Sequence, residues 1–206
     1  DRSHRALAKV FVAGLVPGAV YAAEITDFSR QDIRCLRTAA LRCANLNARG
    51  VHNSCKWTVL GARFDPEVAV NLAPILAFAR EVWANGLKGA EGFRCPEDGL
   101  KSHEFWQVQV KVSEAMGATN HNGLAECESG VGRLGKSLEF FGARFSDKAE
   151  VRDPVTGDIQ KVVQLRFVTF RNGKEADLSI CSPKLLESML VQGKDTQFGE
   201  EAHMQV

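Results

Sequence analysis

Apolar residues in the first half of the chain recur with the period of a helix. Between residues 30 and 45 they are separated by three or four positions: Ile33, Leu36, Ala40 and Ala44. This spacing predicts a helix with one apolar face. Ser29 can cap its first turn, and Asp32 three residues later forms an acidic variant of the capping box. We therefore expect a helix that begins after Ser29 and ends near Asn45.

A second well-marked helix is predicted to begin at Asp65-Pro66. The aspartate can act as N-cap, and proline suits the first helical position. The apolar face continues through Val68, Leu72, Ile75, Leu76, Ala79, Val82 and Trp83. Asn85-Gly86 is the expected end, and Pro74 should kink or split the helix. Two shorter helices are predicted upstream, over 5–16 and 19–24.

The second half of the chain predicts a smaller module behind a loop. Residues 87–102 are rich in glycine and contain Cys95-Pro96, so they are expected to be a linker. Residues 105–112 allow either a strand or a helix, and the Ser102 cap favours a helix. A further helix is predicted from Gly130, with its apolar face at Val131, Leu134, Leu138 and Phe141.

Turn signals then predict antiparallel strands between residues 143 and 180. One turn is expected at 153–158, and Asn172-Gly173 favours a two-residue turn. Ser182-Pro183 should start a last short helix, closed by Gly193, with a loose polar tail over 194–206. The expected fold is α+β and mainly α: a helical cluster over 1–86, a linker over 87–102, and a helix plus β-hairpin module over 103–193.

One segment matches a phosphate-binding loop letter for letter. Residues 130–137 read GVGRLGKS, so Gly130, Gly135, Lys136 and Ser137 could hold the phosphates and Mg²⁺ of ATP or GTP. The same glycines, with Gly132, fit a dinucleotide fingerprint. Both patterns require a buried strand immediately upstream, and residues 120–129 are too polar to provide one. We therefore favour the helix and keep the nucleotide site as an alternative.

Charge is unevenly distributed along the 206 residues. The net charge is only +1, yet residues 1–64 contain ten basic and four acidic residues, which leaves a net −5 for the rest. Arg30, Arg34 and Arg37 follow one another at positions i, i+4 and i+7 beside the apolar face of the first predicted helix. Such a stripe is either a solvated helix face or a contact surface for an anionic partner.

The apolar runs and the cysteine and histidine residues of the sequence exclude some classes of protein and some kinds of site. No apolar run is long enough to span a bilayer, and no export signal is visible. Six widely spaced cysteines without a paired framework indicate a reducing, intracellular compartment, nuclear or cytoplasmic. No metal site is expected, because His52 and Cys55 have no second ligand pair. Cys55 with His52, or Cys127 with His121, would form a nucleophilic site only if the fold brought each pair together.

Several short stretches resemble the segment that follows the polymerase core in reverse-transcriptase-like proteins of non-LTR retroelements, above all those of dinoflagellates. The matching stretches are residues 14–24 (GLVPGAVYAAE), 36–40 (LRTAA), Asp65-Pro66 with Pro74, 79–83 (AREVW) and 130–142 (GVGRLGKSLEFFG). The sequence departs from the family at Ala22, where glycine is common, and at Val131, where proline is common. It also contains no Asp-Asp pair, which the two-metal chemistry of a polymerase would need.

The resemblance implies a non-catalytic thumb and connection segment that contacts RNA or an RNA–DNA hybrid. A polymerase palm is then expected upstream in the parent chain, and the start at Asp1 agrees with an excerpt. No cofactor and no membrane partner are implied. The candidate nucleic-acid contacts are the cations of the first third: Arg30, Arg34, Arg37, Arg42, Lys56 and Arg63. Trp57 could stack on a base, although a place in the core is the stronger expectation. A helical protein-interaction scaffold is a further alternative.

Overall fold

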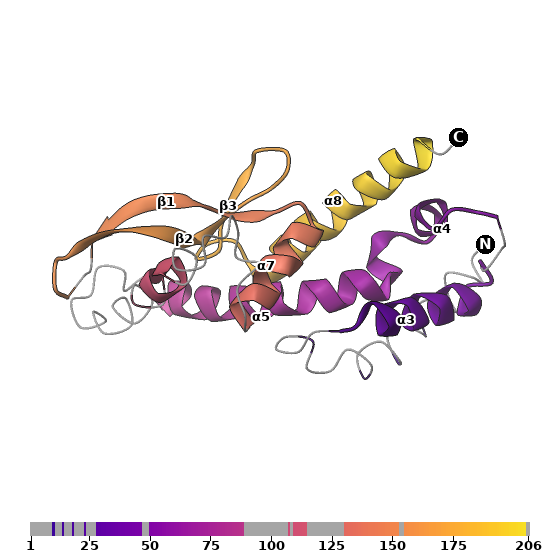
Figure 1. The fold of residues 1–206 in the computed structure, drawn as a ribbon, viewed down its shortest axis with the longest axis horizontal. Coiled ribbons are helices and arrows are strands. Elements are labelled where there is room, and N and C mark those ends of the chain that lie inside the picture. The colour runs from indigo at the N-terminus through magenta and orange to yellow at the C-terminus, as the bar shows by residue number, and fades with distance from the viewer. Residues whose placement is uncertain are drawn as a thin grey trace. The chain divides into compact units, whose positions relative to one another are not determined.

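The protein is an α+β chain that is mainly helical, as the sequence predicts (Figure 1). The structure, a computed structural model, describes residues 28–46, 50–88, 109–114, 130–152 and 155–204, with positions 10, 14, 18, 23 and 107. The chain folds as two compact units, one of residues 1–74 and 187–206 and one of residues 75–186. The predicted helices over 5–16 and 19–24, apart from positions 10, 14 and 23, and residues 89–102 of the predicted linker lie outside the described residues.

Helix α3 (Arg30–Cys43) begins and ends in the first unit where its sequence signals predict. Ser29 Oγ accepts the backbone N–H of Asp32 at 3.1 Å and donates to the Asp32 carboxylate at 2.6 Å, so the capping box is confirmed. At the other end, Asn45 adopts φ 53°, a left-handed conformation that asparagine tolerates. Ala40 and Leu41 are its buried residues.

Helix α4 (Asn53–Leu60) and the short 3₁₀ helix η2 (Ala62–Phe64) connect α3 to α5 (Pro66–Lys88). The predicted cap of α5 is confirmed, because the backbone N–H of Glu67 donates to Asp65 Oδ1 at 2.9 Å. Pro74 lies inside one continuous helix and does not split it, although the division between the two units falls at this residue. The predicted end at Gly86 is wrong, because α5 continues to Lys88 and takes in the first residues of the predicted linker.

Helix α8 (Pro183–His203) corrects the prediction for the end of the chain. Its start is as expected, with the N–H of Leu185 donating to Ser182 Oγ at 3.3 Å. Gly193, however, does not end it, and the predicted loose tail is helical to His203. Lys194 and Phe198 beyond this glycine are buried in the first unit. Tertiary burial therefore outweighs the helix-breaking tendency of one glycine, which amounts to about 1 kcal/mol.

The second unit contains a three-stranded antiparallel sheet of order β1-β2-β3, which confirms the predicted strands. Strand β1 (Arg144–Arg152) and strand β2 (Ile159–Thr169) form a long ribbon, and β3 (Glu175–Asp177) pairs only with residues 167–169 (Figure 1). The turn at Asn172-Gly173 has three residues and not two. The N–H of Phe170 donates to the Lys174 carbonyl at 2.8 Å, with Gly173 at φ 78°.

Residues 109–114 are helical, in agreement with the helix favoured for this ambiguous segment. They cover a part of the β2 edge that β3 is too short to reach. Gln109 Oε1 accepts the N–H of Leu165 at 3.3 Å, and Ser113 Oγ accepts the N–H of Val163 at 2.8 Å. The two side chains are four residues apart, so they project from the same face of the helix. They satisfy strand donors that would otherwise be buried without a partner.

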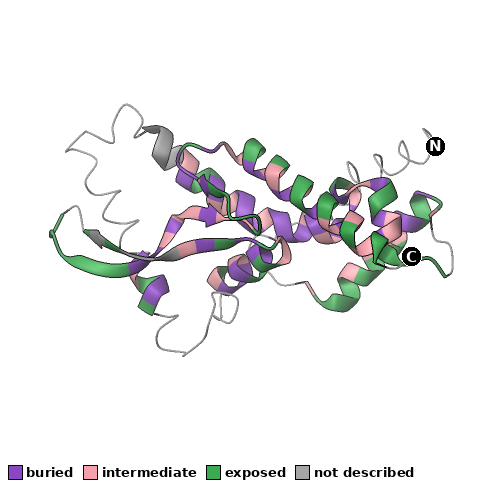
Figure 2. Ribbon diagram, turned by 90° about the horizontal axis from the view of Figure 1, so that it is seen from above, coloured by how far each residue is buried: buried purple, intermediate pink, exposed green. Residues whose placement is uncertain are grey.

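Helix α7 (Gly130–Phe140) is also confirmed, with Leu138 fully buried. In the same unit, the rings of Phe78 from α5 and Phe145 from β1 meet edge to face at 5.5 Å between centroids. Figure 2 shows that buried residues gather where helices cover the sheet, whereas the outer end of the β1–β2 ribbon is exposed.

Replacing Ser113 by Ala should destabilise the protein by about 1 to 3 kcal/mol, because the buried N–H of Val163 would lose its acceptor. Urea unfolding followed by circular dichroism measures this, and amide exchange should quicken at Val163 and Leu165. Glu114→Ala, at an exposed position of the same helix, is the control. Equal stability of both variants would contradict the edge-covering role.

Candidate nucleic-acid interface

The predicted arginine stripe of α3 divides into residues that face solvent and one that does not. Arg30 and Arg34 are exposed, whereas the side chain of Arg37 is only 23% exposed. The three arginines therefore differ in environment, because Arg37 takes part in internal ion pairs and its predicted contact with nucleic acid stays a prediction.

Arg37 is shared by two carboxylates and an aromatic ring. Its Nη2 lies 2.9 Å from Asp65 Oδ2, and its Nη1 donates to the carboxylate of Glu67. The guanidinium carbon lies 5.2 Å from the ring centroid of Trp57, a cation–π distance. One side chain thus connects α3 with α4 and with the first turn of α5. Trp57 is fully buried beneath it, so the core interpretation of this residue is confirmed.

The carboxylate of Asp65 has no solvent-exposed surface, which makes its protonation sensitive to its neighbours. Desolvation by burial raises the pKa of Asp65 to about 7, and Glu67 acts in the same direction. Arg37, the backbone N–H of Glu67 and Lys194 oppose the rise. Lys194 is itself buried, and burial lowers its pKa. Two cations and two carboxylates therefore occupy one poorly solvated cluster: Arg37, Lys194, Asp65 and Glu67.

Helix α8 adds polar contacts to the same unit. Ser54 Oγ donates to Glu201 Oε2 at 2.7 Å, and this hydrogen bond is the main reason why the pKa of Glu201 is lowered. Asp195 Oδ1 accepts the N–H of Ala62 at 2.6 Å, and Lys194 Nζ lies 5.4 Å from the ring centroid of Phe198. The two hydrogen bonds join the last turns of α8 to α4 and η2, whereas the Lys194–Phe198 contact lies within α8.

The exposed face of α3 presents a row of three arginines and one threonine, one at every fourth position. Arg30, Arg34, Thr38 and Arg42 are all exposed. Residues four apart on a helix rise by about 6 Å, so the row extends for about 18 Å. Within the part of the chain that the structure describes, none of the three arginines forms an ion pair. We call these four residues the α3 ridge.

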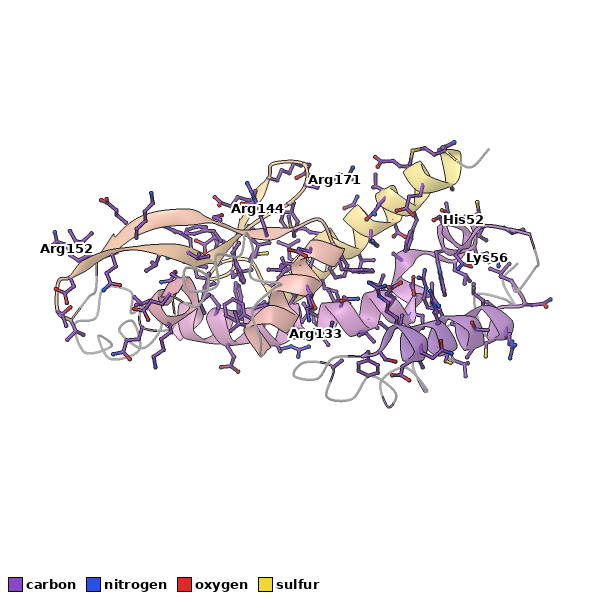
Figure 3. The ribbon with its side chains drawn as sticks, viewed as in Figure 1. His52, Lys56, Arg133, Arg144, Arg152 and Arg171 are labelled. Carbon is purple, nitrogen blue, oxygen red and sulfur yellow. The ribbon has the colours of Figure 1, made fainter. Side chains whose placement is uncertain are left out.

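The other predicted contacts are less clearly arranged. Arg63 is exposed, and Lys56 is half-buried on α4, where Figure 3 places it near His52. Among the described residues, no hydrogen bond or ion pair joins either cation to the α3 ridge, so they remain predictions. The charge of the whole unit is also smaller than the first third implies. Residues 1–74 with 187–206 hold eleven basic and ten acidic residues, a net +1.

The phosphate-loop lookalike lies inside α7, in agreement with the favoured interpretation. Gly130 begins the helix, and Gly135, Lys136 and Ser137 follow within it. Helical N–H groups at these inner positions donate along the helix and cannot converge on phosphates as those of a loop do. Ser137, the proposed Mg²⁺ ligand, has no exposed surface. Residues 120–129, where a preceding strand was required, lie outside the described residues.

The thiol and metal alternatives gain no support. Within the described ranges, no group of three or more histidine, cysteine or acidic residues could hold a metal ion. His52 Nδ1 accepts the N–H of Ser54 at 3.3 Å as the cap of α4, which gives this side chain a structural role. Cys127 and His121 lie outside the described residues. No helix among those described is long and apolar enough to cross a membrane.

Comparisons with protein-family models, with curated proteins and with solved structures find no match for this chain. Its site is therefore argued from its own residues. Sequence reasoning identified Asp65 only as a cap and missed Glu67 and Lys194 as partners in the charged cluster. The sequence offered one signal for this cluster, the acidic residues without basic neighbours just after the basic first third. Charge pairs between residues 28 or more positions apart leave no periodic pattern in the sequence.

The folded protein should be more stable near pH 6 than near pH 8. In the unfolded chain Asp65 titrates near 3.8 and in the fold near 7, so the folded state binds more protons between these values. Its stabilising contribution is complete below the lower value and is lost as pH rises through 7. The free energy of unfolding should fall by at most about 1.4 kcal/mol per pH unit in this window.

Urea unfolding at four pH values from 6 to 8 measures this slope. Asp65→Asn keeps a cap oxygen but cannot titrate, so the fall attributed to this carboxyl should disappear. Asp158→Asn, an exposed carboxylate in the other unit, should keep the wild-type slope. A slope that survives unchanged in Asp65→Asn would show that another group is responsible.

Proposed function

We propose that the first unit binds the phosphate backbone of RNA or an RNA–DNA hybrid through the α3 ridge, as a non-catalytic part of a reverse-transcriptase-like protein. The observation that carries the proposal is the alignment of Arg30, Arg34 and Arg42 on one exposed row, without carboxylate partners among the described residues. The resemblance of residues 36–40 and 79–83 to retroelement proteins also supports this proposal.

The chemistry of the ridge suits a chain of phosphates better than a single small anion. Arginine is always protonated and offers a planar fork of donors that pairs with phosphate oxygens. Thr38 occupies the gap between Arg34 and Arg42 with a hydroxyl that donates to the carbonyl of Arg34 at 2.8 Å. A row about 18 Å long can contact several successive phosphates of one strand. Contacts of this kind position a duplex without reading its sequence.

Arg37 is not part of the ridge, although it lies on the same side of α3, about 20° around the helix axis from Arg30. Its ion pairs with Asp65 and Glu67 hold this side of α3 against α4 and α5. The neighbouring arginines of the ridge remain exposed. Binding therefore needs no rearrangement of α3, and affinity is not reduced by the cost of ordering this helix.

The test is binding of a fluorescent RNA–DNA hybrid at several salt concentrations. The wild-type association constant should fall steeply as salt rises, because bound counterions are released. The variant Arg30→Gln/Arg34→Gln/Arg42→Gln should bind more weakly and should reduce the log–log salt slope by about 2 to 3 units. Single-stranded RNA and the DNA duplex of the same sequence serve as comparison ligands.

The matched control removes three exposed cations from the other unit: Arg171→Gln/Lys174→Gln/Lys184→Gln. It carries the same net charge as the ridge variant, so an effect of overall charge would weaken both equally. Wild-type protein without salt-sensitive affinity, or equal losses in the two variants, would refute the proposal.

A further inference from the structure

Strand β1 presents an edge that differs from the other edge of the sheet. The order β1-β2-β3 places β1 outermost, and in the described part of the chain no strand pairs with its outer side. The opposite edge is covered along residues 163–169, because β3 pairs with residues 167–169 and Ser113 and Gln109 accept the N–H groups of Val163 and Leu165. An open edge strand is a template for pairing with another chain.

The outer half of β1 is regular enough to pair. Register shifts occur between Phe145 and Ala149, but from Ala149 to Arg152 each residue pairs in order with β2. Glu150 and Arg152 are both exposed, and alternation places them on one face of the ribbon. Figure 3 shows Arg152 at the far end of the ribbon, away from Arg144 and Arg171. Their partners across β2 are Lys161 and Ile159.

This segment is complementary in charge to itself. When two copies pair antiparallel about residue 151, Glu150 of each stands directly opposite Arg152 of the other. The row across four strands then reads Lys161, Glu150, Arg152 of the second copy, Ile159 of the second copy, with each carboxylate between two cations. Opposite charges in directly facing positions stabilise a sheet, and like charges destabilise it.

We propose that the outer half of β1 is a homodimer interface, in which two copies of this chain join their sheets edge to edge about a two-fold axis at residue 151. The inference is independent of the nucleic-acid proposal, because it uses only the second unit. A symmetric pairing places the same patch on both partners, as a two-fold axis requires.

The area of the proposed contact is small, so the experiment must be able to detect a weak dimer. Four regularly paired residues on each chain bury far less than the roughly 1,200 Å² of a standard stable interface. Association should therefore be weak and concentration-dependent. Sedimentation equilibrium of the full chain over a wide concentration range should show the mass rising from 22.5 kDa toward twice that value.

Charge reversal provides the decisive variants. Glu150→Arg alone and Arg152→Glu alone place like charges opposite each other, so each variant should remain monomeric. An equimolar mixture of the two should associate, because each Arg then faces a Glu of the other chain. The double variant E150R/R152E should dimerise again by itself. Both positions are exposed, and circular dichroism confirms folding of every variant.

Glu139→Arg, at an exposed position of α7, is the matched control and should keep the wild-type association. Amide exchange at residues 149–152 should slow by at least twofold at concentrations where the mass has risen. A wild-type chain that stays monomeric at the highest concentration overturns the proposal. Single reversals that still dimerise, or a mixture that does not, overturn it equally.

Discussion

The first unit depends on the need to neutralise a carboxylate that has no access to water. Asp65 caps α5, is buried, and forms an ion pair with Arg37 of α3. Removing one partner from a buried charge pair costs far more than the pair contributes in total, so without Arg37 the carboxyl of Asp65 would be held still more strongly in its protonated form. The Arg37 guanidinium forms ion pairs with Asp65 and Glu67 and lies against the ring of Trp57. These contacts join α3 to α4 and to the first turn of α5.

Local signals allowed the elements to be predicted, because their causes lie within a few residues. The caps at Ser29 and Asp65, the helix from Gly130 and the antiparallel strands all agree with the structure. Gly193 shows the limit of such signals. Nothing near it in the sequence indicates that Lys194 and Phe198 will be buried, and this burial continues α8 through the glycine.

The candidate site was only partly predictable for a similar reason. The period of α3 placed Arg30, Arg34 and Arg37 along one side of a helix, but their environments differ by tertiary contact alone. Arg37 lies closest to the apolar face, so packing of that face brings it to Asp65 and Glu67, about thirty positions later. A helical stripe therefore predicts which residues are neighbours and does not predict which of them remain in solvent.

In the folded unit, acidic residues from other parts of the chain largely balance the positive charge of the first third. The net +6 of residues 1–64 becomes +1 for the unit, because Asp65, Glu67 and the acids of α8 join it. Long-range attraction of a polyanion by such a unit is weak. In the proposed function, affinity would come from close contacts, where three arginines on one row act together and distant acids are screened within about 10 Å. The proposal of a phosphate backbone as partner therefore rests on the spacing of the ridge and not on the net charge of the chain.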